Sequence, residues 1–284
     1  MNLIVQGPDV PIPDLKQLAK LTSATAIEAV TPTAFRLVAA DADQRDAVAA
    51  YCEENRFDCG WMPAERRIDD FGLLVMDMDS TLITIECIDE IADMQGLKPQ
   101  VAAITEAAMR GEIDFAESLR RRVSLLEGLD QSALQRVYDE RLQLSPGAET
   151  LLAAARTAGI KTLLVSGGFT FFTERLKPRL GLDYTAANTL EIVDGKLTGR
   201  VLGDIVDAQG KADWLQRVRS QLGLAKDQVI AMGDGANDLK MMAEAGLSIA
   251  YRAKPVVRAQ ASYALNQVGL DGVVPLLGAA RQNS

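Results

Sequence analysis

The fold class follows from one stretch of the chain, Phe71-Gly72-Leu73-Leu74-Val75-Met76-Asp77-Met78-Asp79-Ser80-Thr81. An unbroken apolar run bounded by polar residues is typical of a strand that is buried on both faces. In open α/β sheets, ligands bind beyond the carboxyl ends of such strands. Side chains two residues apart in extended chain project to the same side, so Asp77 and Asp79 form an acid pair at that position. The alternative is an Asx turn in which Asp79 caps the next helix.

A second acidic loop follows the apolar run 229–232 and reads Gly233-Asp234-Gly235-Ala236-Asn237-Asp238-Leu239. Its glycines let the backbone turn tightly and approach a ligand closely. Asp234 and Asp238 bring the carboxylates of the two loops to four. Hard oxygen ligands at strand ends suit Mg²⁺, and a divalent cation with a lysine would relieve their mutual repulsion. The alternative is two unrelated acidic turns.

The composition is that of a globular chain with enough apolar material for a core. Of its 284 residues, 48% are hydrophobic and 24% are charged. The net charge is −9 and no basic stripe is visible, so we expect no nucleic-acid partner. No apolar stretch approaches the roughly 20 residues that span a bilayer, so we expect no membrane partner. The three cysteines and a start without a secretory signal predict a cytoplasmic protein.

Histidine is absent from the chain. This excludes Ser-His-Asp hydrolysis, Cys-His proteolysis and histidine-ligated zinc. Acid–base work must therefore fall to Asp, Glu, Lys, Tyr or Cys. A mechanism that uses aspartates and Mg²⁺ is compatible with this composition.

Residues 1–68 are predicted to form a small α+β domain of βαββα order, which resembles ferredoxin-like regulatory modules. The expected elements are strands 3–5, 25–31 and 34–40 with helices 12–21 and 41–56. The segment from Trp61 to Arg67 is interpreted as a linker.

Residues 69–284 are predicted to form a second domain with a parallel, Rossmann-like sheet, because strands alternate with helices. The expected elements are strands 71–76, 160–165, 228–232 and 247–250, a hairpin over 188–202 that turns at Asp194-Gly195, and helices 211–222 and 237–245.

One interval breaks this alternation. Between Thr81 and Ser145 lie about sixty residues of helical pattern, too many for a simple crossover. An apolar stripe at helical spacing runs through Ile113, Ala116, Leu119, Val123 and Leu126. We interpret residues 83–143 as a helical cap above the acids, which divides the core into 69–82 and 144–284. The alternative is a helical subdomain without a role in catalysis.

Two further motifs carry polar groups at predicted strand–helix junctions. Ser166-Gly167-Gly168 follows an apolar run and precedes a helix expected near Phe169, which would suit an anion site. The alternative is an ordinary strand-to-helix turn, since many of these contain Ser-Gly. Lys211 follows Gly210 at the start of another helix, where its charge opposes the helix dipole. A ligand-binding role would explain that position, although a solvated lysine is the alternative.

The ordered set of motifs resembles the haloacid dehalogenase-like hydrolases, and among them most closely the phosphoserine phosphatase family. It comprises Asp77-Met78-Asp79-Ser80-Thr81, then Ser166-Gly167-Gly168, then Lys211, then the loop 233–238. Segments 86–92 and 115–126 resemble that family's substrate-recognition segments. The resemblance covers about residues 71–270 and implies a Rossmann-like core with a helical-bundle cap. Residues 1–70 resemble the amino-terminal extension of longer bacterial members.

The resemblance implies a catalytic role for each acid. Asp77 would attack phosphorus and become a transient aspartyl phosphate. Asp79 would protonate the departing serine oxygen and then take a proton from the hydrolysing water. Mg²⁺ would be held by Asp77, by the main-chain carbonyl of Asp79 and by Asp234, with Asp238 as outer support.

The resemblance also implies how the phosphate is bound. Ser166, the Gly167 amide, Lys211 and Asn237 would surround its oxygens as charge spreads over them.

The remaining implied roles belong to the cap. Glu86 would accept hydrogen bonds from the substrate ammonium, and Arg122 would bind the substrate carboxylate. Phe115 would shield the site from water, with Met109 beside it. The alternative for these two is a plain core position in the cap.

The activity implied by the resemblance is Mg²⁺-dependent hydrolysis of the small molecule O-phospho-L-serine, the last step of serine biosynthesis. Transfer of the phosphoryl group to another alcohol, or a different small phosphomonoester, is the alternative within enzymes. A phospho-accepting receiver module is the alternative from another class, but receivers lack a cap and an Asp79 equivalent. The oligomeric state is left open, with a homodimer as one option.

Overall fold

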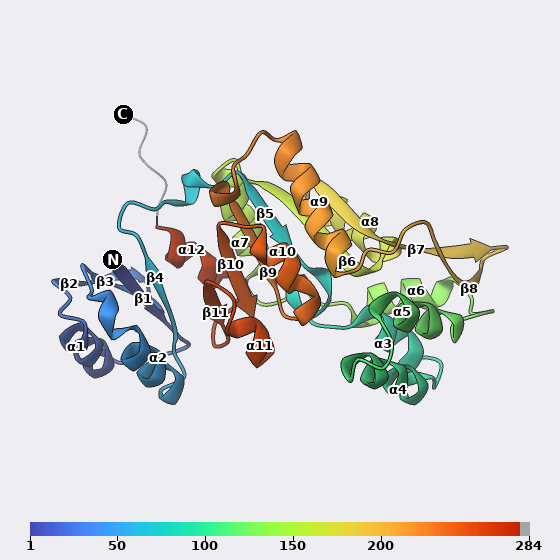
Figure 1. Ribbon diagram of the computed structural model, residues 1–284, viewed down its shortest axis with the longest axis horizontal. Coiled ribbons are helices and arrows are strands. Elements are labelled where there is room, and N and C mark those ends of the chain that lie inside the picture. The colour runs from blue at the N-terminus through green and yellow to red at the C-terminus, as the bar shows by residue number, and fades with distance from the viewer. Residues whose placement is uncertain (279–284) are drawn as a thin grey trace.

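The centre of the molecule is a seven-stranded sheet in the computed structural model, which describes residues 1–278 (Figure 1). Its strands are β5 (Leu73–Met76), β6 (Lys161–Phe169), β7 (Tyr184–Val193), β8 (Lys196–Leu202), β9 (Val229–Gly233), β10 (Leu247–Tyr251) and β11 (Tyr263–Leu265). In space they follow the order β11-β10-β9-β5-β6-β7-β8. β5 pairs in parallel with β6 and with β9, so the two acidic loops leave the same edge of the sheet side by side. The predicted Rossmann-like core is confirmed.

Helices cover both faces of this sheet (Figure 1). They are α7 (Ala148–Thr157), α8 (Thr170–Leu180) and α12 (Val273–Leu277) on one face, and α9 (Ala208–Gln221), α10 (Leu239–Ala243) and α11 (Pro255–Arg258) on the other. Every residue of β5 is buried. Leu74 and Met76 pack with α7 and α8, whereas Leu73 and Val75 pack with α9 and α10. Burial on both faces explains the unbroken apolar run.

The N-terminal domain is a four-stranded antiparallel sheet covered by two helices, and its ferredoxin-like class is confirmed. Its elements are β1 (Asn2–Gln6), α1 (Ile12–Leu21), β2 (Ala26–Thr31), β3 (Ala34–Val38), α2 (Arg45–Glu54) and β4 (Asp58–Met62), with strand order β2-β3-β1-β4.

The order of elements is βαββαβ, because Trp61 and Met62, interpreted as linker, belong to the additional strand β4. Cys59 and Trp61 pack on the domain's own helices. Gly60 and Met62 meet the large domain instead. With both faces buried and a glycine at its centre, β4 lacks the alternating pattern that marks a strand in sequence.

β4 also docks the small domain on the core. The Asp58 carboxylate accepts hydrogen bonds from the backbone N–H groups of Asn266, Gln267 and Val268 at 2.8–3.0 Å. Gly60 leaves room for the Tyr263 ring, since a Cβ there would lie 2.4 Å from a ring carbon. Polar and close apolar contacts therefore join the two domains along one strand.

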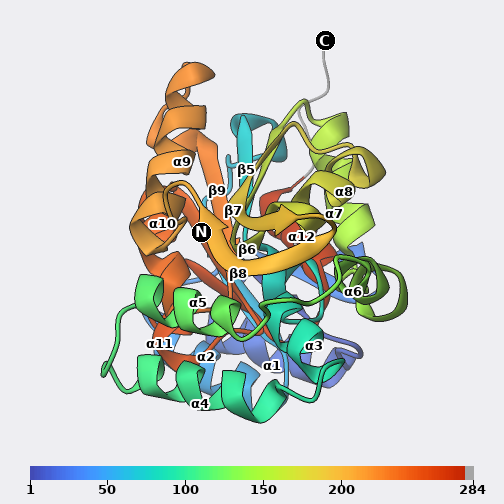
Figure 2. The same ribbon diagram turned by 90° about the vertical axis from the view of Figure 1, so that its right-hand side faces the viewer.

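The cap consists of α3 (Cys87–Asp93), α4 (Lys98–Met109), α5 (Phe115–Ser124) and α6 (Ser132–Arg136). It lies at the far end of the core from the small domain, beneath the β7–β8 hairpin (Figures 1 and 2). Leu119, Val123 and Leu126 of the predicted stripe are buried. Ile113 precedes α5, whose N-cap is Asp114, so the helical stripe is shorter than predicted.

Backbone contacts join the cap to the core at both of its ends. An isolated bridge pairs Ile83 with Leu144 where the cap leaves and re-enters the core. At the other end, Gly128 N–H donates to the Leu197 carbonyl and Leu197 N–H donates to the Leu129 carbonyl, at 2.8 Å each. Among residues 1–278, no helix has the length and apolar character needed to cross a membrane.

Candidate active site

The first acids of the site occupy the turn that follows β5. The Asp77 carboxylate accepts a hydrogen bond from the Met78 N–H at 2.7 Å. Asp79 is extended, with φ −66° and ψ 136°, and Ser80 then adopts a left-handed conformation with φ 55°. The chain therefore turns away from the strand at Ser80, and both acids line the cavity described below.

Lys211, on the first turns of α9, joins the two acidic loops. Its Nζ lies 2.7 Å from Asp77 Oδ1 and 2.7 Å from Asp238 Oδ1. Burial alone would lower the pKa of Lys211, but Asp238 and Asp77 raise it above its usual value. The pKa of Asp77 lies well above its usual range because of burial and the nearby Asp238, against the opposing effect of Lys211. One ammonium does not neutralise all these acids, so the site retains affinity for another cation.

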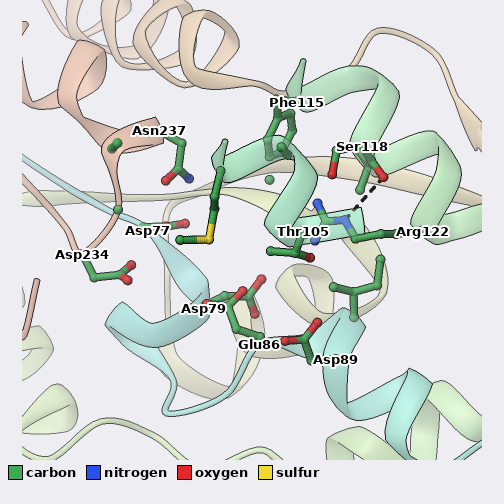
Figure 3. Close-up of a pocket in the computed structure, with 18 of the residues that line it drawn as sticks. Asp77, Asp79, Glu86, Asp89, Thr105, Phe115, Ser118, Arg122, Asp234 and Asn237 are labelled. Atoms are coloured by element: carbon green, nitrogen blue, oxygen red, sulfur yellow. Dashed lines mark hydrogen bonds between the residues drawn. The ribbon is translucent and has the colours of Figure 1, made fainter. Parts of the chain in front are cut away.

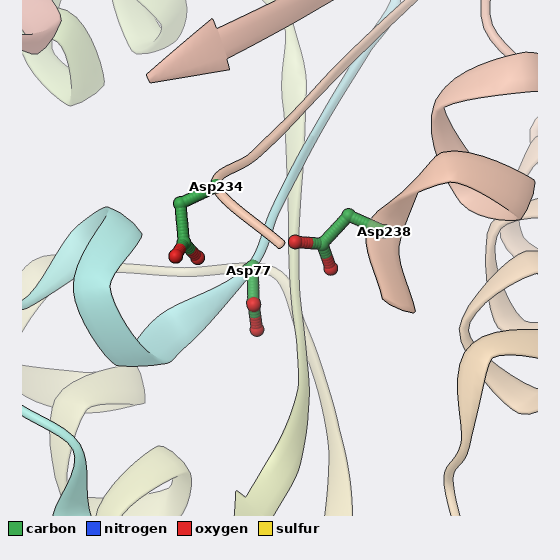
Figure 4. A group of neighbouring side chains, drawn as sticks. All are labelled: Asp77, Asp234 and Asp238. Atoms are coloured by element: carbon green, nitrogen blue, oxygen red, sulfur yellow. The ribbon is translucent and has the colours of Figure 1, made fainter. Parts of the chain in front are cut away.

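Asp77, Asp234 and Asp238 each place a carboxylate oxygen within 4.8 Å of the others (Figure 4). Gly233 permits this approach, because a Cβ there would lie 2.3 Å from Asp238 Oδ2. Three carboxylates form an all-oxygen donor set, which fits Mg²⁺.

Asp238 is the least available of the three. Its Oδ1 accepts from Lys211, and its Oδ2 accepts from the Gly235 N–H at 3.0 Å. These bonds favour the outer role expected for Asp238. Among the described residues, the Asp79 side chain does not belong to this cluster. The expected metal contact of Asp79 is through its main-chain carbonyl, and that contact stays a prediction.

The Ser166-Gly167-Gly168 segment lies beside the acids, but its setting differs from the prediction. β6 continues through Phe169, so these residues are the last part of a strand and α8 starts only at Thr170. The Ser166 hydroxyl accepts from the Gly168 N–H at 2.8 Å. A Cβ at Gly168 would lie 2.7 Å from Asp79 Oδ2 and 3.0 Å from Ser166 Oγ. The Ser166 hydroxyl and the Asp79 carboxylate therefore both lie close to Gly168.

A cavity of about 470 Å³ lies between these loops and the cap (Figure 3). Ten of the predicted site residues line it: Asp77, Asp79, Glu86, Met109, Phe115, Arg122, Gly167, Lys211, Asp234 and Asn237. Ser166 and Asp238 are both fully buried beside it. The Phe115 ring covers Gly167, where a Cβ would lie 2.9 Å from the ring. Met109 lines the opening and is 68% exposed, so it is not a core residue of the cap.

The cap presents charges of both signs to the cavity (Figure 3). Glu86 Oε1 accepts from the Ser80 hydroxyl at 2.7 Å, and burial raises the pKa of Glu86. Arg122 Nε donates to the Ser118 carbonyl at 3.4 Å. Burial lowers the pKa of Arg122, while Asp89 and Glu86 oppose that shift. An acceptor and a guanidinium donor therefore face one cavity.

Asp79 is suited to proton transfer near neutral pH. Burial and the neighbouring Glu86 raise the pKa of Asp79 to about 7, although the Cys87 N–H donates to its carboxylate at 3.2 Å and opposes this. A carboxyl group with such a pKa is protonated often enough to act as an acid and charged often enough to act as a base.

Other residues that line the cavity were not predicted as site residues, among them Asp89, Thr105 and Lys254. Asp89 lies on α3, three residues after Glu86. Residues at that spacing share one face of a helix, so the spacing was a signal that could have identified Asp89. Thr105 and Lys254 come from α4 and from the loop before α11. Nothing local in the sequence brings those segments to the acids.

Comparison with known proteins agrees with this geometry. A family model described as haloacid dehalogenase-like hydrolase matches residues 74–243. The chain belongs to the haloacid dehalogenase-like hydrolases. A second model, described as a domain of unknown function, matches residues 3–48 of the small domain.

Several relatives are phosphoserine phosphatases, so the predicted place within that family is confirmed. A phosphoserine phosphatase from Polaromonas sp. is 57% identical over 216 residues, which are 74% of this chain and 92% of that protein.

Two solved structures match along nearly the whole chain. The crystal structure of a hydrolase of this family from Salmonella enterica serovar Typhi has a TM-score of 0.89 at 34% identity, and covers 98% of this chain and 99% of that one. An unliganded probable phosphoserine phosphatase from Vibrio cholerae has a TM-score of 0.85 at 41% identity, with coverage of 97% and 86%. Both matches extend beyond the hydrolase domain into the small N-terminal domain.

Proposed function

We propose that this protein hydrolyses O-phospho-L-serine to L-serine and inorganic phosphate, with Mg²⁺ and through an aspartyl-phosphate intermediate. The observation that carries the proposal is the placement of Glu86 and Arg122 over Asp77 and Asp79 in one cavity. Phosphoserine carries an ammonium and a carboxylate beside its phosphate ester. An acceptor, a donor and a nucleophile in one cavity match these three groups.

In the first step, a carboxylate oxygen of Asp77 attacks phosphorus and the bond from phosphorus to the serine oxygen breaks. Asp79 donates its proton to that oxygen, so serine leaves as an alcohol. In the second step, water attacks the phosphorus of the aspartyl phosphate, and Asp79 accepts the proton. The bond between phosphorus and the Asp77 oxygen breaks, so the Asp77 carboxylate is regenerated and inorganic phosphate leaves.

Asp77 and Asp234 would hold Mg²⁺, with Asp238 behind them and the Asp79 carbonyl as the further ligand implied by the family. The bound ion would supply positive charge to the phosphoryl oxygens during transfer. Lys211, Asn237 and the Gly167 amide would add hydrogen-bond donors around the same oxygens. Phe115, lying against Gly167, would exclude water from the ester.

Phosphate release from a panel of small phosphomonoesters with MgCl₂ present tests the proposal. The panel contains O-phospho-L-serine, phosphoethanolamine, phosphoglycolate and an alkyl phosphate, and the D77N protein serves as the blank. We expect kcat/KM for phosphoserine to exceed the others by at least tenfold, about 1.4 kcal/mol of selective binding. Equal rates across the panel would contradict the substrate assignment.

The same assay with added acceptor alcohols separates hydrolysis from phosphoryl transfer, which shares the first step. Release of inorganic phosphate that matches serine formation supports hydrolysis. A deficit of phosphate that grows with alcohol concentration would support transfer. The cytoplasmic location, the role in serine biosynthesis and the homodimer stay predictions.

A further inference from the structure

Two cysteines of the small domain lie together away from the active site. Cys52 is on α2 and Cys59 is on β4, and both belong to the apolar cluster between the helices and the sheet. Cys52 is buried, with 1% of its surface exposed, whereas Cys59 is half-buried. The helix residue and the strand residue therefore share one packed layer.

The two thiols are neighbours. The Phe57 N–H donates to the Cys52 carbonyl at 2.8 Å, which turns the chain before β4 back onto the end of α2. The proximity of the two side chains lowers the pKa of Cys59 and raises the pKa of Cys52. Cys59 is also the more exposed of the two, so an oxidant reaches its sulfur first. A thiolate with a neighbouring thiol is the arrangement in which an oxidised sulfur can be resolved as a disulfide.

The pair is also open to small molecules. Both cysteines line a cavity of about 660 Å³ between the small domain and the core, opposite α11. The third cysteine, Cys87, provides an internal comparison. It is fully buried, and burial together with Asp79 raises its pKa well above the usual value. Access and ionisation both favour Cys59 over Cys87.

We propose that Cys52 and Cys59 form a reversible redox modification site, which closes to an intramolecular disulfide when a peroxide or a low-molecular-weight disulfide enters this cavity. With hydrogen peroxide, the Cys59 thiolate attacks one peroxide oxygen, the O–O bond breaks, and with one proton taken up the products are a sulfenic acid and water. Cys52 sulfur then attacks the sulfenic sulfur, and the leaving hydroxide takes the Cys52 proton to form the second water. With a low-molecular-weight disulfide, Cys59 forms a mixed disulfide and Cys52 displaces the small thiol.

The position of the pair gives the bond a structural consequence. On one face of β4, Cys59 packs against α2, while on the other face the preceding residue, Asp58, binds three backbone N–H groups of the core. α11, which lines the same cavity, begins directly after Lys254 of the active-site cavity. The disulfide would fix α2 to the strand through which the small domain docks.

Mass spectrometry of the full-length protein tests this proposal. The protein is treated with hydrogen peroxide or oxidised glutathione, unfolded, alkylated and digested. We expect the treated chain to lose two hydrogen atoms, with a peptide that links Cys52 to Cys59 and with Cys87 as the one alkylated cysteine of the three. A reductant should restore alkylation at all three positions.

Two variants separate the steps. C59S should abolish the disulfide. C52S should leave Cys59 as a stable mixed disulfide after oxidised glutathione, because no resolving thiol remains. Melting curves of both variants establish that they fold. The peptide map of the wild-type protein tests the disulfide even if a variant does not fold. Three alkylated cysteines under conditions that oxidise free glutathione would overturn the proposal. So would oxidation of Cys87 as fast as Cys59, or Cys59 sulfonic acid without the disulfide.

Discussion

Lys211 Nζ lies 2.7 Å from Asp77 Oδ1 and joins that acid to the second acidic loop through Asp238. All three side chains are buried, so the ammonium fixes the direction of the Asp77 carboxylate. Loss of one member would leave a buried charge without its partner, which is a costly arrangement in a protein interior. The carboxylate that we propose as the nucleophile is therefore held in one direction by its neighbours.

The D77N change tests the nucleophile without removing the side chain. The amide is nearly isosteric and can still accept a hydrogen bond from Lys211, but it cannot attack phosphorus. We expect steady-state phosphate release to fall by roughly 10⁴–10⁶-fold, as for removal of other covalent nucleophiles. D194N is the matched control, because Asp194 is exposed in the β7–β8 turn. Substantial turnover by D77N, with deamidation excluded by mass, would refute the assignment.

The D79N change tests the acid. With phosphoserine, an alkoxide must be protonated as it leaves, so we expect a loss of about 10²–10⁴-fold. With a phenyl phosphate the leaving oxygen is far less basic, so the first step should be much less affected. A burst experiment measures that step separately from hydrolysis of the intermediate. Equal losses for both esters would show that Asp79 has another role.

Much of the sheet and of the acidic site was predictable because short stretches of sequence specify them. The apolar run before Asp77 and the run before Asp234 each specify a buried strand, and parallel pairing of those strands brings the acids together. Helical spacing likewise identified the cap, since Leu119 and Val123 are buried as expected.

The rest depends on contacts between distant segments. β4 is a strand because its two faces meet α2 and Tyr263, and neither contact is visible in the sequence around Gly60. Lys254 reaches the cavity only because β10 lies next to β9 in the sheet. Ser166 lies in an extension of β6 that the glycines after it obscured.

The metal-free protein should lose stability as the pH rises. Burial raises the pKa of Asp79 to about 7 and that of Asp234 to about 6, above their values in the unfolded chain. The folded state then binds more protons than the unfolded state between about pH 4 and pH 7, so the free energy of unfolding falls across that range. If Mg²⁺ binds at Asp234 as proposed, it would stabilise the charged form of these carboxylates. Its stabilising effect should therefore be larger at about pH 8 than at about pH 5.

Thermal melts with EDTA or with MgCl₂ at the two pH values measure this difference. We expect the Mg²⁺-induced rise in Tm to be greater by at least about 2–4 °C at the higher pH, equivalent to about 1 kcal/mol. D234N should remove a large part of both the pH dependence and the Mg²⁺ effect. An Mg²⁺ effect of the same size at both pH values would mean that the ion binds elsewhere.

The cap residues make separate predictions for separate parts of the substrate. R122A removes a charge-assisted contact worth about 1.5–3 kcal/mol, so KM for phosphoserine should rise by roughly ten- to more than a hundredfold. Phosphoethanolamine has no carboxylate and should be almost unaffected. E86Q should weaken amino-bearing esters more than phosphoglycolate, because the amide is a poorer acceptor for an ammonium.

R120A is the matched control for the cap, since Arg120 is an exposed arginine on the same helix, α5. It should leave all four esters of the panel unchanged. The informative quantity is the ratio of kcat/KM values between esters, because a general loosening of the cap lowers them together and leaves that ratio constant. If R122A and E86Q lower every ester in parallel, the two residues hold the cap in place and do not recognise serine. Opposite shifts of the ratio in the two variants can arise only if each residue contacts a different group of the substrate.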